Sequence, residues 1–394
     1  MRFKLLILLI VLLLVLSACN TPISSSVPSE VPTTQQDDFP TPFPDTPSPP
    51  EIDAPLVDTP ALTSVQFLTE LNGWGVTETQ IVRTNDGGIT WYNVTPPDIT
   101  EAGYSVRLVI MDNNSVWIQL PDYNNYPNSG ILYHTTDGGL TWSATTTPFS
   151  DGDVRFLDVN NGWALADLGA GAGSDAIAVY QTTDGGSTWD RKFINDPNSA
   201  NASDSIPLGG LKSGLTPLNM QTAWVYGTVY SSGTVYVFRT DDGGVNWVQI
   251  SSLPLPQGAE DAELSFERVQ FVTANDAFML MRIASDESKM AVYISNDSGE
   301  TWSLTPTLIP VGGLADFLSA TEAVVYNGQQ FYVTRDAART WSIIPPDVNF
   351  GDTFASMDFV NPNTGWVITV DPTTNHRSLY RTSDGGATWF PIID

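Results

Sequence analysis

The side chains that could perform chemistry in this chain are mainly carboxyl groups. The sequence has 44 Asp and Glu residues, 16 Lys and Arg residues and two histidines, His134 and His376. Two facing carboxyl groups are enough for glycoside hydrolysis, but nothing in the sequence singles out one pair. Two histidines are too few partners for a zinc site or a Ser–His relay, and the acidic segments lack the spacing of an EF-hand loop. The sequence therefore predicts no catalytic residues, no metal and no cofactor.

The charge balance limits the kinds of partner that the chain can have. The formal net charge is −28 at pH 7. Such a surface repels nucleic-acid phosphates and anionic lipid headgroups, so we expect no nucleic-acid binding. The charge either keeps the protein soluble or favours a basic partner.

One aspartate recurs in a fixed context, first in RTNDGGITW at residues 83–91. The chain contains seven copies of this turn motif, Thr/Ser-x-Asp-x-Gly/Ala-x-Thr/Asn-Trp, counting the first, at intervals of 39 to 58 residues. The aspartates are Asp86, Asp137, Asp184, Asp242, Asp297, Asp336 and Asp384, and the tryptophans are Trp91, Trp142, Trp189, Trp247, Trp302, Trp341 and Trp389. An Asp at this position accepts backbone N–H bonds, Gly supplies positive φ, and Trp buries apolar surface. A catalytic or ligand-binding site is needed only once in a protein, so seven copies of the motif indicate a structural role.

The segments between the motifs predict short antiparallel strands. Each unit has an alternating strand such as VQFLTE, a turn, a strand opened by an aromatic residue, a third strand before the motif, and a fourth strand at its Trp. Four such strands per unit of about 50 residues are typical of a propeller blade. We therefore expect an all-β, seven-bladed β-propeller over residues 61–394, with four-stranded antiparallel blades and one Asp motif per blade. Ring closure would rely on blade packing, unless residues 52–57 add an outer strand.

The motif resembles the Asp-box, or bacterial neuraminidase repeat, of sialidases, sortilins and some glycoside hydrolases. Combined with the GW strand, as in NGWGV and NTGWVI, it is most similar to the photosystem II stability/assembly-factor family. That resemblance implies a seven-bladed propeller, lipoprotein character and a basic patch for a photosystem partner. A sialidase would need three converging Arg residues and a Tyr–Glu pair. Arg107, Arg155 and Arg268 lie in first strands, but no Tyr–Glu context accompanies them.

Two groups of residues are candidates for binding. Long loops are expected on the face opposite the Asp motifs, where Tyr123, Asn124, Asn125 and Tyr126 offer rings and amides suited to a sugar or a peptide. The same loop could instead be only a polar turn. Aligning the first strands on their Phe places five polar residues at one equivalent position of the central channel: Gln66, Arg155, Gln270, Asp316 and Asp358. They could hold a small ligand or a cation, or simply be solvated by water.

The N-terminal residues predict export and lipidation. Arg2 and Lys4 precede an apolar run at residues 5–16 and the junction LSAC at residues 16–19. This pattern resembles a bacterial lipoprotein signal peptide over residues 1–18, with Cys19 as the lipidated residue; an ordinary secretory signal with a chance Cys is the alternative. Residues 19–60 are rich in Pro, Ser and Thr and predict a disordered tether.

These features together predict a monomeric propeller that is exported and anchored to the outer face of a bacterial membrane only through Cys19. We expect it to act without catalysis, as a protein-binding or assembly scaffold at the cell envelope. The alternative is a carbohydrate-binding or glycoside-hydrolase-like propeller related to sialidases. The partner would accordingly be an envelope protein or a glycan.

Overall fold

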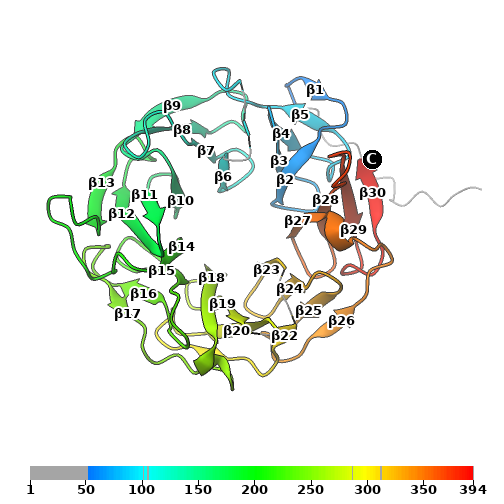
Figure 1. Cartoon of the computed structure of the whole chain (residues 1–394). Helices are drawn as coiled ribbons and strands as arrows, with labels where there is room; N and C mark the ends of the chain where they lie inside the picture. The colour runs from blue at the N-terminus through cyan, green and yellow to red at the C-terminus, as the bar shows by residue number, and fades with distance from the viewer. Residues whose placement is uncertain (1–51, 101, 104–105, 286, 311–312, 394) are drawn as a thin grey trace, which may run out of the picture. The chain divides into compact units, whose positions relative to one another are not determined.

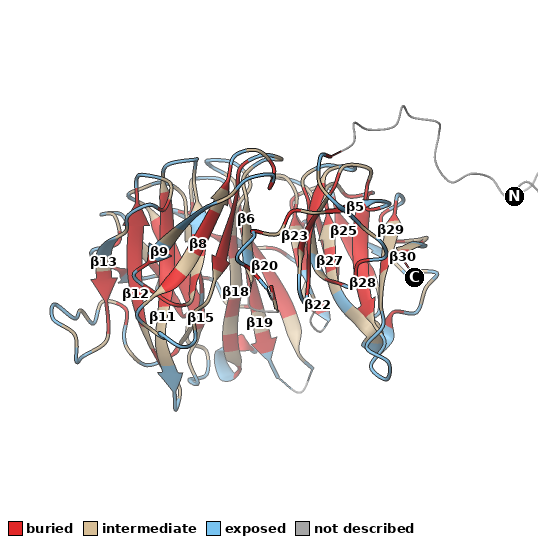
Figure 2. Cartoon of the chain, turned by 90° about the horizontal axis from the view of Figure 1, so that it is seen from above, coloured by how far each residue is buried: buried red, intermediate tan, exposed pale blue. Residues whose placement is uncertain are grey.

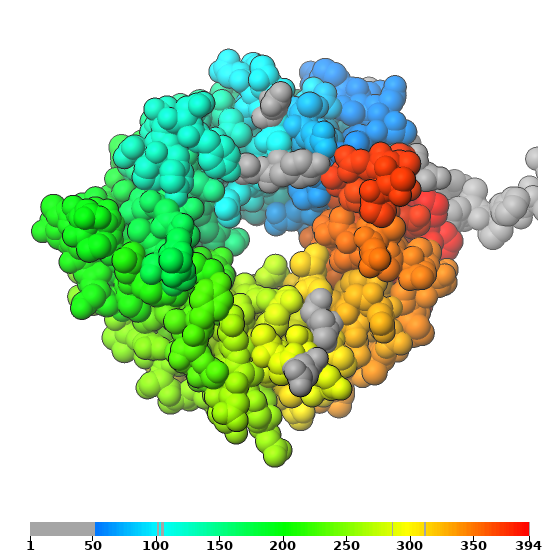
Figure 3. All heavy atoms as spheres, in the orientation of Figure 1, coloured from blue at the N-terminus to red at the C-terminus, as the bar shows by residue number. Residues whose placement is uncertain are grey.

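The structure is a computed structural model that describes residues 52–100, 102–103, 106–285, 287–310 and 313–393. These residues belong to one compact unit, Ser48–Asp394, whose strands are arranged in a ring (Figure 1). Figure 3 shows an opening at the centre of this ring. The predicted signal peptide, Cys19 and the tether up to residue 51 lie outside the described residues.

The first three sheets are separate antiparallel blades. The first contains β1 (Leu56–Val57), β2 (Leu62–Phe67), β3 (Gly73–Thr77), β4 (Ile81–Thr84) and β5 (Trp91–Asn93). The second contains β6 (Arg107–Ile110), β7 (Val116–Leu120), β8 (Gly130–Thr135) and β9 (Ser143–Thr147). The third contains β10 (Gly152–Phe156), β11 (Gly162–Gly171), β12 (Ser174–Thr182) and β13 (Asp190–Ile194).

The remaining strands form one large sheet and two further blades. The large sheet contains β14 (Leu211–Pro217), β15 (Ala223–Thr228), β16 (Val237–Thr240), β17 (Val248–Gln249), β18 (Glu263–Phe271), β19 (Ala277–Ala284), β20 (Lys289–Ser295), β21 (Ser303–Leu304) and β22 (Ile309–Pro310). The next blade contains β23 (Ala315–Phe317), β24 (Ala323–Tyr326), β25 (Phe331–Thr334) and β26 (Ser342–Ile344). The last contains β27 (Phe354–Phe359), β28 (Gly365–Val370), β29 (Arg377–Thr382) and β30 (Phe390–Ile393). Short 3-10 helices at Ala259–Asp261 and Gly351–Thr353 precede β18 and β27.

The prediction of an all-β propeller with four-stranded antiparallel blades is confirmed, but the predicted number of seven blades is wrong. The structure has five separate blades, four of them four-stranded and one five-stranded, together with a nine-stranded sheet. The nine-stranded sheet forms because the nine-residue strand β18 reaches back to β15, where Ser265 pairs with Thr228. Two Asp motifs therefore lie in one sheet, and the expectation of one motif per blade fails there as well.

The N-terminal strand widens the first blade. Leu56 and Val57 of β1 pair with Tyr92 and Trp91 of β5, so residues 56–57 supply an outer strand, and they add it to the first blade. The last blade is built from its own four strands.

The first and last blades are joined by side chains. The rings of Phe67 and Trp366 stack with centroids 3.5 Å apart, and the Trp366 indole donates to the Gly87 carbonyl at 3.0 Å. The ion pair of Arg381 with Glu70, 3.8 Å long, spans the same junction. Side-chain packing and polar contacts therefore close the ring at this junction.

The turn motif follows one hydrogen-bonding pattern. In the third blade, Asp184 accepts from the Thr182 hydroxyl at 2.8 Å, and from the N–H and the hydroxyl of Thr188 at 2.8 and 2.6 Å. The Trp189 indole donates to the Gly186 carbonyl at 3.1 Å. The Gly185 N–H donates to the Asn160 carbonyl at 2.8 Å, in the turn between the first two strands. In every other unit the equivalent N–H group also donates to a carbonyl in the turn between the first two strands; these donors are Gly87, Gly138, Gly243, Ser298, Ala337 and Gly385. The turns and the Asp motifs therefore share one face of the ring.

The motif copy without glycine keeps the same backbone region. Ala337 and Ala338 have φ values of 58° and 59°, whereas Gly138 and Gly139 have values of 74° and 89°. An L-residue tolerates the left-handed region only near the lower values. The loss of glycine is therefore accommodated by a small change of φ, and the side chain of Ala338 is fully buried.

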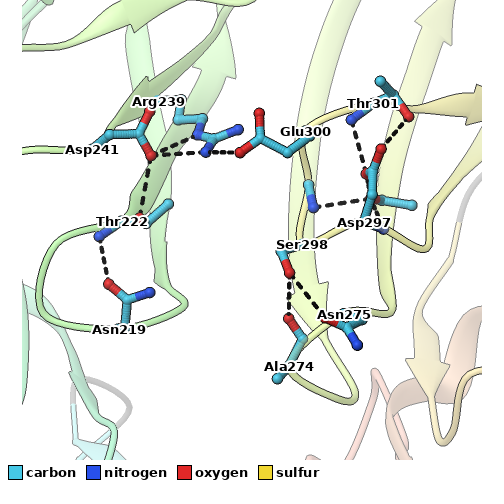
Figure 4. Close-up of polar contacts among 12 residues, drawn as sticks. Asn219, Thr222, Arg239, Asp241, Ala274, Asn275, Asp297, Ser298, Glu300 and Thr301 are labelled. Carbon is cyan, nitrogen blue, oxygen red and sulfur yellow. Dashed lines mark hydrogen bonds and ion pairs between the residues drawn. The ribbon is translucent and has the colours of Figure 1, made fainter.

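Cations on this face link neighbouring units. Figure 4 shows Arg239, which binds Asp241 in its own unit and Glu300 in the next, at 2.8 and 2.5 Å. Arg83 donates to the Gly138 carbonyl at 3.2 Å in the same manner. Figure 2 shows that the buried residues lie along the strands, whereas exposed residues concentrate in the turns and loops at both faces.

Candidate functional site

The ring encloses a central cavity of about 700 Å³. Its walls are formed by the innermost strands β2, β10, β14, β18, β23 and β27, with Tyr226 of β15 behind them. All five polar residues that the alignment of first strands placed in the channel line this cavity: Gln66, Arg155, Gln270, Asp316 and Asp358. The structure thus brings together residues that are up to 292 positions apart in the sequence.

On one side of the cavity, side chains connect each inner strand to the backbone of the next. Asp358 of β27 accepts a hydrogen bond from the Phe67 N–H of β2 at 2.6 Å, across the junction of the last and first blades. Asp316 of β23 accepts from the Phe359 N–H of β27 at 3.0 Å. Gln270 of β18 donates to the Phe317 carbonyl of β23 at 2.9 Å. These contacts stand in for the strand pairing that is missing between blades.

The same arrangement continues toward the third blade. The Thr216 hydroxyl of β14 donates to the Val269 carbonyl of β18 at 2.5 Å. Asp153 of β10 accepts from the Leu215 N–H at 3.1 Å and pairs with Arg155 at 2.9 Å. Much of the polarity predicted for the channel is therefore used to hold the ring together.

The two carboxyl groups at the junction have unusual pKa values. Burial raises the pKa of Asp358 to about 8, and the negative charge of Asp316 adds to the rise. Burial raises the pKa of Asp316 to about 6, although Arg268, 3.9 Å away, favours its ionised form. At neutral pH Asp358 is therefore mainly protonated and Asp316 mainly ionised. Such a pair can donate and accept hydrogen bonds at the same time.

The part of the wall next to Asp316 is cationic. Arg155 and Arg268 extend from β10 and β18, and their side chains are 53% and 42% exposed. Tyr226 lies at the same wall and is only 4% exposed. Sequence reasoning did not place Arg268 or Tyr226 in the channel. A signal for Arg268 was present, because residues two apart on a strand share a face and Arg268 is two positions before Gln270.

The predicted binding loop, which contains residues 123–126, lies in the connection between β7 and β8. Tyr123 is 63% exposed and Tyr126 is 36% exposed. The Tyr126 hydroxyl donates to Asp167 at 3.1 Å. The Asn124 N–H and the Asn125 side-chain amide donate to Asp122, at 3.0 and 2.6 Å. Asn125 therefore supports the turn, and the Tyr126 hydroxyl connects it to Asp167 of β11.

A smaller cavity of about 300 Å³ lies between β6, β10, β11 and β14. Lys212 lines it and donates to the carbonyls of Asp175, Pro207, Leu208 and Gly210 at 2.8 to 3.0 Å. Burial lowers the pKa of Lys212 to about 8. Because four carbonyl groups surround its ammonium group, Lys212 holds the chain before β14 in place.

Two further features bear on chemistry. Within the described part of the chain, no three His, Cys, Asp or Glu side chains are grouped so that they could hold a metal ion. The same residues contain no helix long and apolar enough to cross a bilayer.

Comparison with known proteins gives two classes of relative. Residues 51–192 match the family model of the photosynthesis system II assembly factor YCF48. An alignment of 298 residues with the xyloglucanase Xgh74A of Acetivibrio thermocellus shows 24% identity. An alignment of 357 residues with a xyloglucanase of Hypocrea jecorina shows 23% identity. These alignments cover 71% and 79% of this chain but only 31% and 36% of the relatives. The chain thus spans about a third of the length of these curated relatives.

Solved structures share the fold. YCF48 bound to a D1 peptide aligns with a TM-score of 0.51 at 19% identity, over 84% of this chain and 93% of that protein. The GH74 xyloglucanase of Xanthomonas campestris aligns with a TM-score of 0.57 at 10% identity, over 84% of this chain and 54% of the enzyme. At these identities the likeness concerns the fold alone.

A second family model covers more of the chain. It describes the DUF6242 beta propeller domain and matches residues 123–326, which are more than half of the 394 residues. The match runs from the β7–β8 loop through the nine-stranded sheet to β24. The chain therefore belongs to the DUF6242 beta propeller domain family.

Proposed function

We propose that this propeller is a non-catalytic binding scaffold for a protein of the cell envelope. The observation that carries the proposal is that the carboxyl groups in the channel bind backbone N–H groups of the protein itself. Asp316 and Asp358 each accept a backbone N–H from the neighbouring blade, at 3.0 and 2.6 Å, so both are committed to ring closure. A catalytic acid or base must instead move a proton to or from a substrate in the transition state. The YCF48 relative, whose solved complex holds a D1 peptide, is consistent with protein binding.

The binding surface in this proposal is the face opposite the Asp motifs. The exposed rings of Tyr123, Tyr126 and Tyr230 belong to its loops, and Tyr is enriched where proteins bind one another. On the Asp-motif face, by contrast, cations such as Arg83 and Arg239 are engaged with neighbouring units.

The experiment is a pull-down from solubilised envelope with the purified propeller as bait. Recovery of a stoichiometric protein that is lost with Tyr123→Ala and Tyr126→Ala supports the proposal. Leu71→Ala, at a residue 46% exposed in the turn between β2 and β3, is the matched control and should leave recovery unchanged. Absence of any stoichiometric partner contradicts a scaffold role.

The second candidate function is glycan binding or glycoside hydrolysis. It is favoured by the sequence similarity to xyloglucanases and by the exposed tyrosine rings, which are suited to stacking on sugars. A glycan array with clear hits that disappear in the Tyr123→Ala, Tyr126→Ala variant would support this function in place of the first. A silent array would count against it.

We further propose that the chain is exported and anchored through Cys19, with residues 1–18 as its signal peptide. The apolar run at residues 5–16 and the LSAC junction support this. Labelling cells with a clickable fatty acid should mark the wild-type chain and not Cys19→Ser. A wild-type chain that stays unlabelled in a lipidating bacterial host would contradict the anchor.

A further inference from the structure

The central cavity has a cationic wall whose guanidinium groups are only partly occupied by contacts within the ring. Arg155 of β10 and Arg268 of β18 lie on either side of β14, and Tyr226 stands between them on β15. Burial raises the pKa of Tyr226, and the positive charges of Arg155 and Arg268 both act against that rise. The two guanidinium groups therefore act on the same hydroxyl group, which also lies 3.5 Å from the hydroxyl of Thr216.

The protein's own contacts occupy few of the guanidinium donors. Arg155 pairs with Asp153 through Nε, at 2.9 Å. Arg268 donates through Nη1 to the Ala315 carbonyl at 2.7 Å, and Asp316 is 3.9 Å away. Each guanidinium has five N–H donors in a planar fork that matches a carboxylate. The exposed fractions of 53% and 42% leave both groups accessible from the cavity.

We infer that the central cavity binds a small organic carboxylate between Arg155 and Arg268. Charge-assisted hydrogen bonds from Arg to a carboxylate are about twice as strong as those between neutral groups. The volume of about 700 Å³ lies within the range of ligand pockets. This inference goes beyond the proposed scaffold function, because the site lies inside the ring and does not depend on which partner the loop face binds.

The acidic wall defines the rest of the ligand. Asp316 lies 3.9 Å from Arg268, whereas Asp358 lies farther round the ring on β27, and the carboxyl oxygen of Asp358 that does not accept the Phe67 N–H can bond a hydroxyl or amide group at the far end of the same molecule. A carboxylate that also carries such donors fits this division of charge. The C-terminus of a peptide and a uronic acid share this chemistry, and the two sources can be separated by experiment.

The charges around the cavity give the expected dependence on pH. The groups that face it are Arg155 from β10, Glu267 and Arg268 from β18, Asp316 from β23, Asp358 from β27 and Tyr226 from β15, and Asp153 of β10 pairs with Arg155. Glu267 is bound by Arg282 at 2.5 Å. Acidification protonates Asp316, whose pKa is about 6, and so removes the carboxylate that competes for Arg268. Binding of an anion should therefore tighten as the pH falls from 8 to 5.

The test is isothermal titration calorimetry with defined probes. The probes are glucuronate, acetyl-Ala-Ala with a free C-terminus, its C-terminal amide, and glucose. We expect at least one carboxylate probe to bind and the amide and glucose not to bind. Glucuronate alone would identify a uronic-acid site, the free peptide alone would identify a C-terminal site, and binding of both would support the shared chemistry.

The variants test the assigned residues. Arg155→Gln and Arg268→Gln should each weaken carboxylate binding about tenfold or more, because a charge-assisted contact is lost. Arg335→Gln, which changes a cation that binds Asn363 at 2.6 Å on the other face, is the control and should bind as the wild type does. Tyr226→Phe, which removes only a hydroxyl group, keeps the test available if an Arg variant does not fold. Equal binding of carboxylate and amide, or wild-type binding by folded variants, would overturn the inference.

Discussion

The sharpest prediction concerns Asp358, whose carboxyl group joins the last blade to the first. In the folded protein burial and the charge of Asp316 raise its pKa from 3.8 to about 8. A carboxyl group with a raised pKa favours folding in its protonated form. The free energy of unfolding should therefore decrease as the pH rises from about 4, and this decrease should level off above pH 8. Asn at this position keeps an oxygen that can accept the Phe67 N–H and has no charge to titrate.

The size of the effect follows from the linkage of protons to folding. One proton held only by the folded state changes stability by about 1.4 kcal/mol per pH unit. Asp316 titrates near pH 6, so above that value Asp358 supplies most of the slope. Between pH 6 and pH 8 we expect the wild type to lose on the order of 2 kcal/mol. The Asp358→Asn variant should lose little over this interval and should exceed the wild type in stability at pH 8.

Urea unfolding at pH 5, 6, 7 and 8, followed by tryptophan fluorescence, measures these slopes. The matched control is Asp184→Asn in the third-blade turn. Hydrogen bonds from Thr188 hold the pKa of Asp184 below its usual value, so this change should lower stability equally at all four pH values. If Asp358→Asn loses stability with pH as steeply as the wild type, the assignment of the slope to the blade junction is refuted.

Two further changes test the packing. Gly139→Ala places a β-carbon at φ 89° and 2.7 Å from the Val94 side chain, and should lower the free energy of unfolding by about 2–3 kcal/mol in the urea series. Its control, Gly103→Ala, lies at φ 67° with open space around it and should lower it by about 1 kcal/mol, so equal losses would contradict the steric argument. Trp366→Ala removes the stack on Phe67 and should cost about 3–5 kcal/mol with a lower urea midpoint; a loss below 1 kcal/mol would mean that the ring closes without this contact.

The parts of the fold that depend on local patterns were predictable from the sequence. Strand alternation has a period of two, so aligning the first strands on their Phe residues placed Gln66 and Gln270 on one face, and both line the cavity. The motif tryptophans include strongly buried rings, such as Trp91 at 1% and Trp247 at 4% exposure. In each case the relevant information lies within about ten residues of sequence.

The parts that depend on contacts between units were not predictable in this way. The pairing of Thr228 with Ser265, which merges two units into one sheet, depends on where the ends of β15 and β18 meet in space. The repeated residues specify the strands and the turn within each unit, and they give no indication of the pairing between Thr228 and Ser265. The sequence indicated β1 only as an alternative, an outer strand within residues 52–57, because two residues, Leu56 and Val57, are too short to show alternation.

The distribution of charged contacts separates residues that build the ring from residues that remain for binding. On the Asp-motif face, Arg83 and Arg239 reach into the next unit, and in the smaller cavity four carbonyls surround the ammonium group of Lys212. In the channel, the carboxyl oxygens of Asp316 and Asp358 accept N–H groups of the next strand. Arg155 and Arg268 also make contacts within the ring, with Asp153 at 2.9 Å and with the Ala315 carbonyl at 2.7 Å, but their side chains remain 53% and 42% exposed at one cavity. A carboxylate ligand is suited to both guanidinium groups, because Arg and a carboxylate form charge-assisted and often bidentate hydrogen bonds.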